Sequence, residues 1–355
     1  MQLLTRLVIM LFVLPSSSYT SPATAENPDP IALLRGVEQA RSEIKSGRVE
    51  MKVLMESFVP WSQRNEYHLV ITFNGEVRTA RQRYKTLHFV GGDHNAELRQ
   101  LKGDREALVR QGKAAWSDAD YRSAWDGVNF CQIHSDGEGA SYQPTGGGTS
   151  AFIFDPRLLG LLHLPLRNLT LAHCMNHHQA EEVRVVGKDN IAGRQTWHVL
   201  VRMLKHEKHF WIENQKPYRV HKFILLTERE ETVVTSTYPE QAQTVDLPTE
   251  VVMTRHDRKL GKDVNRWTVQ VTDAKLNIPI SPQVGTLASL ILEPGEEVAD
   301  ERIHRRLGYW NGTGLSSDLN VALLLGRARR QAVIDGVSSY IQTVLIPAAF
   351  ACRGM

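Results

Sequence analysis

The sequence lacks the features that mark nucleic-acid-binding proteins and small disulfide-stabilised domains. Its 355 residues have a formal net charge of only +3, and Lys and Arg are interleaved with Asp and Glu instead of forming a basic stripe. Nucleic-acid binding is therefore not expected. Only three cysteines occur, Cys131, Cys174 and Cys352. Such an odd, scattered set is not a disulfide framework. Two alternatives remain: a single disulfide between Cys131 and Cys174, or three buried or free thiols.

Motifs of common catalytic and nucleotide-binding sites are also missing. No G-x-S-x-G is present, and the glycines at 146–148 are not followed by a Lys-Thr pair, which speaks against a phosphate-binding loop. Asp126, Asp155 and Asp273 each adjoin a predicted turn or helix cap, where a carboxylate accepts backbone hydrogen bonds. We therefore expect a non-catalytic protein without a cofactor.

One short segment does contain the residue types of a metal site. On a helix, His173 and His177 would share one face, and Cys174 and His178 the adjacent one. The segment lacks the Glu that zinc peptidases place beside the first His, and no second ligand cluster is evident. The four residues are weak metal candidates, and a metal-dependent hydrolase is the least favoured function.

The N-terminus has the pattern of a signal peptide. Arg6 precedes an apolar run over residues 7–14, and Ala-Thr-Ala at 23–25 supplies an A-x-A cleavage site. The run is shorter than the roughly 20 residues that cross a bilayer as a helix. We expect cleavage before Glu26 and export of a soluble chain to the periplasm or cell envelope; the alternative is an uncleaved anchor.

After this segment the pattern predicts one helix and then many strands. Asp29 and Pro30 suit the N-cap and the first helical position, and apolar residues follow at helical spacing until a stop at Gly47. Antiparallel strands with short links and no intervening helices form a sheet that must curl. Alternation predicts strands at 49–55, 67–73, 77–84, 223–238, 250–255 and 265–272, with an Asn74-Gly75 hairpin turn.

Residues 183–222 show a clear period-two pattern. We expect a Gly-bounded turn at 187–193, a strand with one apolar face, and two further strands at 210–213 and 218–222, which together form a three-stranded antiparallel meander. The alternating apolar residues of its best strand are Trp197, Val199, Val201 and Met203.

Two other parts are less regular. Residues 91–180 are expected to be an irregular insertion that contains a Gly- and Ser-rich loop at 137–150 and a short helix at 154–162. The tail, residues 315–355, is expected to be helical over 319–332. The pattern leaves open whether this helix packs on the sheet or is a poorly ordered appendage.

Several motifs together resemble the bacterial lipoprotein-carrier superfamily, which includes LolA, LolB and the sensor RseB. They are a helix leading into Ser46-Gly47, the G-x-x-x-I-x-G-R-x-T-W-x-V pattern at 187–199, W-I-E at 211–213, and P-Y-R-V at 217–220. Residues 273–302 resemble the closing part of exported relatives. The resemblance implies a mainly β fold over residues 26–314: a curved antiparallel half-open β-barrel with accessory helices on its concave side.

The same resemblance implies an apolar cleft that holds acyl chains. The expected function is a monomeric, exported lipid- or lipoprotein-binding protein; the alternative is an envelope sensor or protein-interaction module with the same fold. The simpler interpretation of these apolar residues is that they form a filled hydrophobic core without a cleft. The residues expected to line the cleft are Trp197, Val199, Val201, Met203, Trp211, Leu158, Leu161 and Leu162.

Overall fold

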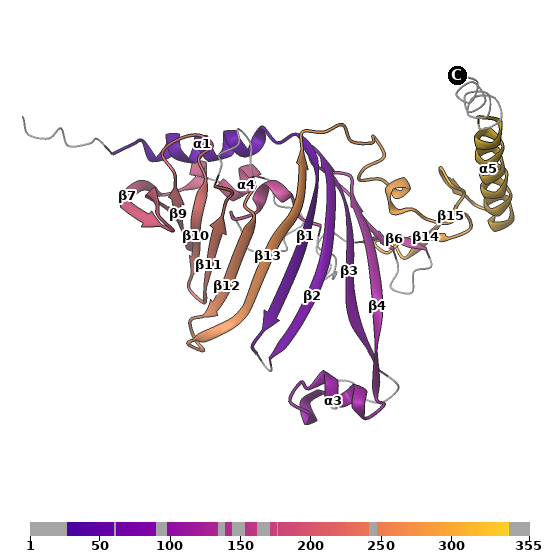
Figure 1. Ribbon diagram of the computed structural model, residues 1–355, viewed down its shortest axis with the longest axis horizontal. Helices are drawn as coiled ribbons and strands as arrows, with labels where there is room; N and C mark the ends of the chain where they lie inside the picture. Colours follow the sequence, from indigo (N-terminus) through magenta and orange to yellow (C-terminus); the bar gives the residue numbers. More distant parts are fainter. Residues whose placement is uncertain are drawn as a thin grey trace, which may run out of the picture.

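The chain folds into one curved, open sheet of 16 strands (Figure 1). No helix among the described residues is both long and apolar enough to cross a membrane. The predicted signal peptide, Leu162 and Cys352 lie outside the described residues. The computed structural model describes residues 27–59, 62–89, 98–133, 139–143, 153–161, 171–175, 177–240 and 247–340.

Two antiparallel meanders make up most of the sheet. The first contains β1 (Ser46–Ser57), β2 (Gln63–Asn74), β3 (Val77–Phe89), β4 (Ala114–Trp125), β5 (Phe130–Ile133) and β6 (Ala140–Gln143). The second contains β7 (Glu182–Ile191), β8 (Arg194–Met203), β9 (His206–Ile212), β10 (Val220–Thr227), β11 (Glu230–Thr237), β12 (Glu250–Asp257) and β13 (Lys262–Leu276). Three late strands follow: β14 (Glu297–Asp300), β15 (Arg305–Trp310) and β16 (Leu315–Ser316).

Pairing of β1 with β13 joins the two meanders, and parallel pairing of β14 with β6 adds the late strands to the first meander. The other strand pairs are antiparallel. The strand order is β16-β15-β14-β6-β5-β4-β3-β2-β1-β13-β12-β11-β10-β9-β8-β7, so β16 and β7 are the two edges. The predicted fold class, a mainly β, curved and half-open antiparallel structure, is thus confirmed.

The helices are few and mostly short. The first, α1 (Pro30–Ser42), begins as predicted, because Asp29 accepts a 3.0 Å hydrogen bond from the Ile31 amide and Pro30 takes the first position. It ends at Ser42, before the predicted stop at Gly47, which lies in β1. The other described helices are α3 (Arg105–Arg110), α4 (Leu171–Met175), α5 (Leu319–Tyr340) and the 3-10 turns η1 (Pro156–Leu158), η2 (His177–Gln179) and η3 (Leu287–Leu290).

Local turn predictions were partly right. Asn74-Gly75 connects β2 to β3, with Asn74 opposite Val77, as the hairpin signal indicated. The turn predicted at 187–193 was too long. Gly187 lies within β7, next to a register shift after Val185 that marks a bulge, and β7 ends at Ile191. A bulge and a turn both tolerate glycine, so composition alone does not separate them.

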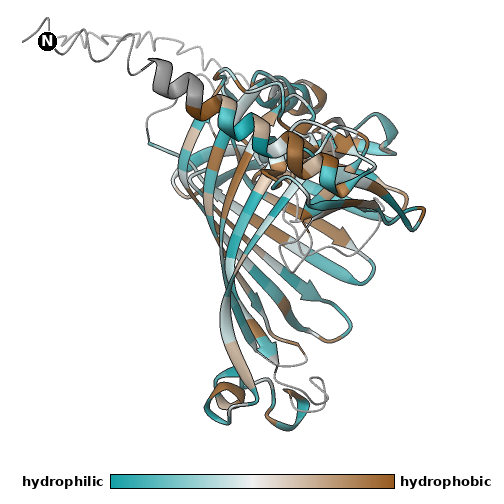
Figure 2. Ribbon diagram, turned by 90° about the vertical axis from the view of Figure 1, so that its right-hand side faces the viewer, coloured by the Kyte–Doolittle hydropathy of each residue, from teal (hydrophilic) through white to brown (hydrophobic). Residues whose placement is uncertain are grey.

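Apolar side chains from both meanders meet in one cluster on the concave face of the sheet. Val49 and Met51 of β1, Ile71 of β2, Val199 of β8 and Phe223 of β10 are each at most 1% exposed and belong to it. Figure 2 shows the matching alternation of hydrophobic and hydrophilic positions along the strands. The sheet therefore buries its concave face under α1, α4 and η1.

Strands also occupy the segment expected to be an irregular insertion. β4 is a 12-residue strand paired along its length with β3, and β6 lies within the predicted loop at 137–150. Beyond β16, the tail is helical as predicted. α5 contacts β15 and β16 and projects from the edge of the molecule in Figure 1.

Candidate functional site

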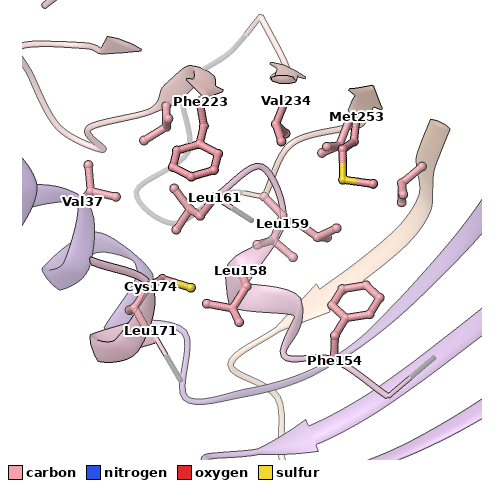
Figure 3. Close-up of a cluster of buried hydrophobic side chains, with 14 of the residues drawn as sticks. Val37, Phe154, Leu158, Leu159, Leu161, Leu171, Cys174, Phe223, Val234 and Met253 are labelled. Atoms are coloured by element: carbon pink, nitrogen blue, oxygen red, sulfur yellow. The ribbon is translucent and has the colours of Figure 1, made fainter. Parts of the chain in front are cut away.

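The centre of the concave face is filled by residues 153–161, a segment that belongs to no strand and that we call the plug. Figure 3 shows Leu158, Leu159 and Leu161 of the plug next to side chains of α1, α4 and the strands β10 to β12. Their partners there include Phe223 and Val234. The apolar plug residues, each at most 3% exposed, are Ile153, Phe154, Leu158, Leu159 and Leu161.

Local sequence explains the shape of the plug. Asp155 caps η1 by accepting a 3.0 Å hydrogen bond from the Arg157 amide, and Pro156 provides the fixed φ of the first position. Gly160 follows with φ +82°, a conformation that other residues adopt only under strain. A Cβ added at Gly160 would lie 2.3 Å from Ser236 Oγ of β11, so the plug touches the sheet directly here.

A buried ionic network fixes the N-terminal end of the plug. Arg157 donates to both carboxylate oxygens of Asp155, at 2.9 Å from Nε and 2.6 Å from Nη2, and reaches Glu76 at 2.9 Å. Arg78 of β3 lies 3.6 Å from the same carboxylate, and the side chains of Arg78 and Asp155 are each 1% exposed. Burial lowers the pKa of Arg78, although the nearby carboxylates oppose this. If Asp155 were removed, the guanidinium groups of Arg78 and Arg157 would remain in this site without the carboxylate that both of them contact.

Arg41 of α1 holds the other end of the plug. Its Nη2 donates to the Leu159 carbonyl at 3.1 Å and to the Tyr238 hydroxyl at 2.9 Å, and Tyr238 in turn donates to the Val220 carbonyl. Its Nη1 is buried with no hydrogen-bond partner among the described residues. A buried cation on the apolar side of α1 thus ties helix, plug and sheet together.

The short helix α4 closes the concave face beside the plug. Lys208 of β9 points to this face and donates a 2.8 Å hydrogen bond to the Cys174 carbonyl at the end of α4. Burial raises the pKa of the Cys174 thiol to about 12, and it likewise raises that of Cys131 to about 12. Both cysteines are free, buried thiols, so the bridge between them that the sequence left open is absent.

The structure places most of the predicted lining residues in the same apolar cluster. Trp197, Val199 and Val201 of β8 are at most 7% exposed and face the concave side, with Met203 half-buried against the cluster. Leu158 and Leu161 belong to the plug itself. Leu162 lies outside the described residues. The predicted residues therefore fall into two groups: those of β8 form part of the wall of the concave face, and those of the plug fill it.

Trp211 needs correction, because it lies on the opposite face of the sheet. It pairs with His198 across β8 and β9, whereas its neighbour Ile212 pairs with Trp197. The Trp211 ring stacks on His198 at 4.2 Å between centroids, and its Nε1 donates to Asp189 at 3.0 Å. Trp211 therefore cannot line a concave cleft.

The outer-face histidines make folding stability depend on pH. His198 Nε2 and His209 Nδ1 are 2.9 Å apart, and burial lowers the pKa of both, although Asp189 beside His198 and Glu207 beside His209 oppose this. Their neutral forms are thus favoured by folding. Their contribution to the free energy of unfolding is complete above the unfolded pKa of about 6.5 and is lost as the pH falls. Urea unfolding from about pH 7.5 to pH 5 should show this decline.

Substitution separates this pair from other titrating groups. His209→Gln should flatten the pH dependence of unfolding. An unaltered pH slope in the His209 variant would contradict the assignment.

The metal candidates do not assemble into a site among the described residues, where no group of three or more His, Cys, Asp or Glu side chains could hold a metal ion. His177 is buried and its ring lies 4.0 Å from that of His178, while the Cys174 thiol is in the apolar cluster. The side chain of His173 lies outside the described residues.

A separate cavity of about 800 Å³ opens along β1 to β4. Its lining combines the aromatic residues Tyr67, Tyr84 and Trp116 with charged side chains of both signs, among them the Arg81 and Asp120 ion pair. This cavity differs from the apolar cleft that the sequence predicted. The apolar cluster of the concave face lies under the plug.

Comparison with known proteins gives likenesses of fold only. No protein-family model and no curated protein sequence matches the chain. Among solved structures it is similar to a DUF1329 family protein from Desulfovibrio piger (TM-score 0.43, 7% identity, 74% of this chain and 100% of that chain). It is also similar to a domain named for outer membrane lipoprotein sorting from Vibrio parahaemolyticus (0.42, 7%, 72% and 96%). A LolA superfamily protein from Nitrosomonas europaea is a third (0.39, 9%, 74% and 100%).

Proposed function

We propose that the protein is a non-catalytic binding protein that takes up an acyl chain of a lipid or lipoprotein on the concave face, in the place of the plug. One observation carries the proposal. The centre of the concave face is filled by five apolar side chains from a segment that makes no strand pairing. Such a segment can leave without breaking the sheet.

The energetics favour an exchange between plug and ligand. Each buried methylene contributes about 0.8 kcal/mol, so a long acyl chain gains on the order of 10 kcal/mol before ordering costs. The plug gains a comparable amount from its own apolar side chains, so the apolar contributions to the exchange largely cancel. The Arg41 and Asp155 contacts then set the balance between the plugged and the ligand-bound state.

After plug displacement, the wall of the site would be formed by the sheet. Trp197, Val199, Val201 and Met203 keep the lining role that the sequence suggested, joined by Phe210 and Phe223 from the same cluster. Leu158 and Leu161 would move away with the plug. Export to the periplasm or cell envelope, as the predicted signal peptide implies, would bring the protein to lipids and lipoproteins.

Weakening the plug should increase acyl binding. Gly160→Ala places a Cβ against Ser236 and should disfavour the plugged state, so a fluorescent fatty-acid probe should bind the folded protein about tenfold more tightly. Gly193→Ala is the matched control: it also has positive φ, at +79°, but no atom within 4 Å, so probe affinity should not change. Equal affinities in both variants would contradict displacement of the plug.

A second measurement separates this function from the alternative. Solvent extraction of the natively folded protein followed by mass spectrometry should release a lipid or an acylated molecule. If extraction repeatedly yields none and no variant binds the probe, an envelope sensor or protein-interaction module of the same fold becomes the better explanation.

A further inference from the structure

The helix α5 has an apolar side that nothing in the described chain covers. Its residues Ala322 and Gly326 are buried against the loop before β14, where a Cβ on Gly326 would lie 2.2 Å from Pro294 Cβ. On an α-helix, Val321, Leu324 and Ala328 point away from that contact. Leu324 is 64% and Val321 45% exposed.

Arginines border this exposed strip on both sides. At 100° per residue, Arg327 lies on one flank of Val321, Leu324 and Ala328, and Arg329 lies on the other flank beyond Leu325. Residues 319–334 contain three arginines and no acidic residue. Arg329 donates to the Asn311 carbonyl at 3.1 Å and Arg330 to Glu293 at 2.8 Å, and these contacts fix the orientation of the helix on the body.

We propose that α5 is an interfacial helix that lays its exposed strip, Val321, Leu324, Leu325 and Ala328, on an anionic lipid surface. An apolar strip with flanking cations matches the acyl boundary and the negative headgroups of such a surface. A second copy of this chain fits less well, because a symmetric helix pair would bring identical arginine-rich flanks together. This surface lies on α5, far along the chain from the plug, and the inference does not depend on acyl binding there.

Vesicle binding by the full chain tests the proposal. Co-sedimentation should show binding to vesicles of equal parts phosphatidylcholine and phosphatidylglycerol, weaker binding to phosphatidylcholine alone, and release by added salt. The double variant Leu324→Gln and Leu325→Gln should bind the anionic vesicles at least about tenfold more weakly. Leu204→Gln, at an 82% exposed position in the turn after β8, should bind like the parent chain.

The charge contribution has its own pair of variants. Arg327→Gln should weaken binding to anionic vesicles about fivefold, and the exposed Arg229→Gln in the turn after β10 should have no effect. Equal binding of the parent chain to both vesicle types, or to neither, overturns the proposal. So does sedimentation equilibrium showing a dimer that the Leu324 and Leu325 double variant abolishes, because the occupant is then a second copy.

Discussion

Replacing Asp155 with alanine is expected to lower the free energy of unfolding by about 3 to 5 kcal/mol, because it leaves a buried ion pair without its anion. Arg78 is 1% exposed and would keep its charge in an apolar environment, and Arg157 would lose its hydrogen bonds to Asp155 and keep only the carboxylate of Glu76. The cap of η1 would be lost as well. Urea unfolding followed by circular dichroism measures the change.

An exposed ion pair provides the control for this prediction. Asp120 pairs with Arg81 at 2.5 Å, but the two side chains are 36% and 41% exposed, so Asp120→Ala should change stability by less than about 1 kcal/mol. The Asp155 variant that remains folded should also bind an acyl probe more tightly than the parent chain. If both aspartate variants were equally stable, the buried network would not be what fixes the plug.

Trp197→Asp is expected to prevent folding under conditions in which the parent chain is stable. Truncating a buried aromatic side chain typically removes about 3 to 5 kcal/mol. A carboxylate against the apolar cluster adds a penalty of several kcal/mol, which Lys188, whose Nζ lies 4.6 Å from the Trp197 ring centroid, offsets only in part. Together these approach the whole stability of a typical domain, about 5 to 15 kcal/mol. Thermal unfolding and the yield of monomeric protein report the loss.

Trp211→Asp is the matched comparison on the other face of the sheet. Its ring is as buried as that of Trp197, but it lies between His198 and Lys222, whose Nζ is 4.7 Å from the ring centroid, and not against the apolar cluster of the concave face. We expect a folded but less stable protein. A folded Trp197→Asp variant that had lost only acyl binding would assign Trp197 to a ligand wall alone and not to the core.

The strands were largely predictable because alternation is a local property. The patterns at 49–55, 67–73 and 197–203 correspond to β1, β2 and β8 with the predicted residues inward. Alternation failed at Phe210 and Trp211, because two adjacent large residues do not show which of them faces the concave side of the sheet. Phe210 packs in the concave cluster, while Trp211 is covered by His198 on the outer face, and only the register with β8 decides between them.

The sequence predicted the position of the plug but not the contacts that hold it in place. Asp155 and Pro156 signalled the start of a short helix, which is a local effect. Arg78, the ion-pair partner of Asp155, lies in β3, and no local sequence pattern predicts a contact between residues so far apart in the chain. Arg41 did carry a signal: at helical spacing it continues the apolar stripe of Leu34 and Val37, and a cation there is unusual enough to suggest a buried contact.

The pairing of β1 with β13 has a consequence for how the chain reaches its native state. The first meander can form early during synthesis, but the partner of β1 spans Lys262–Leu276 and emerges much later. Until then a nascent half-sheet presents an unpaired edge and an uncovered apolar surface, which is the kind of intermediate that aggregates. Such non-local closure also means a high contact order and slow folding. We therefore expect the central seam of the finished sheet to form late in folding.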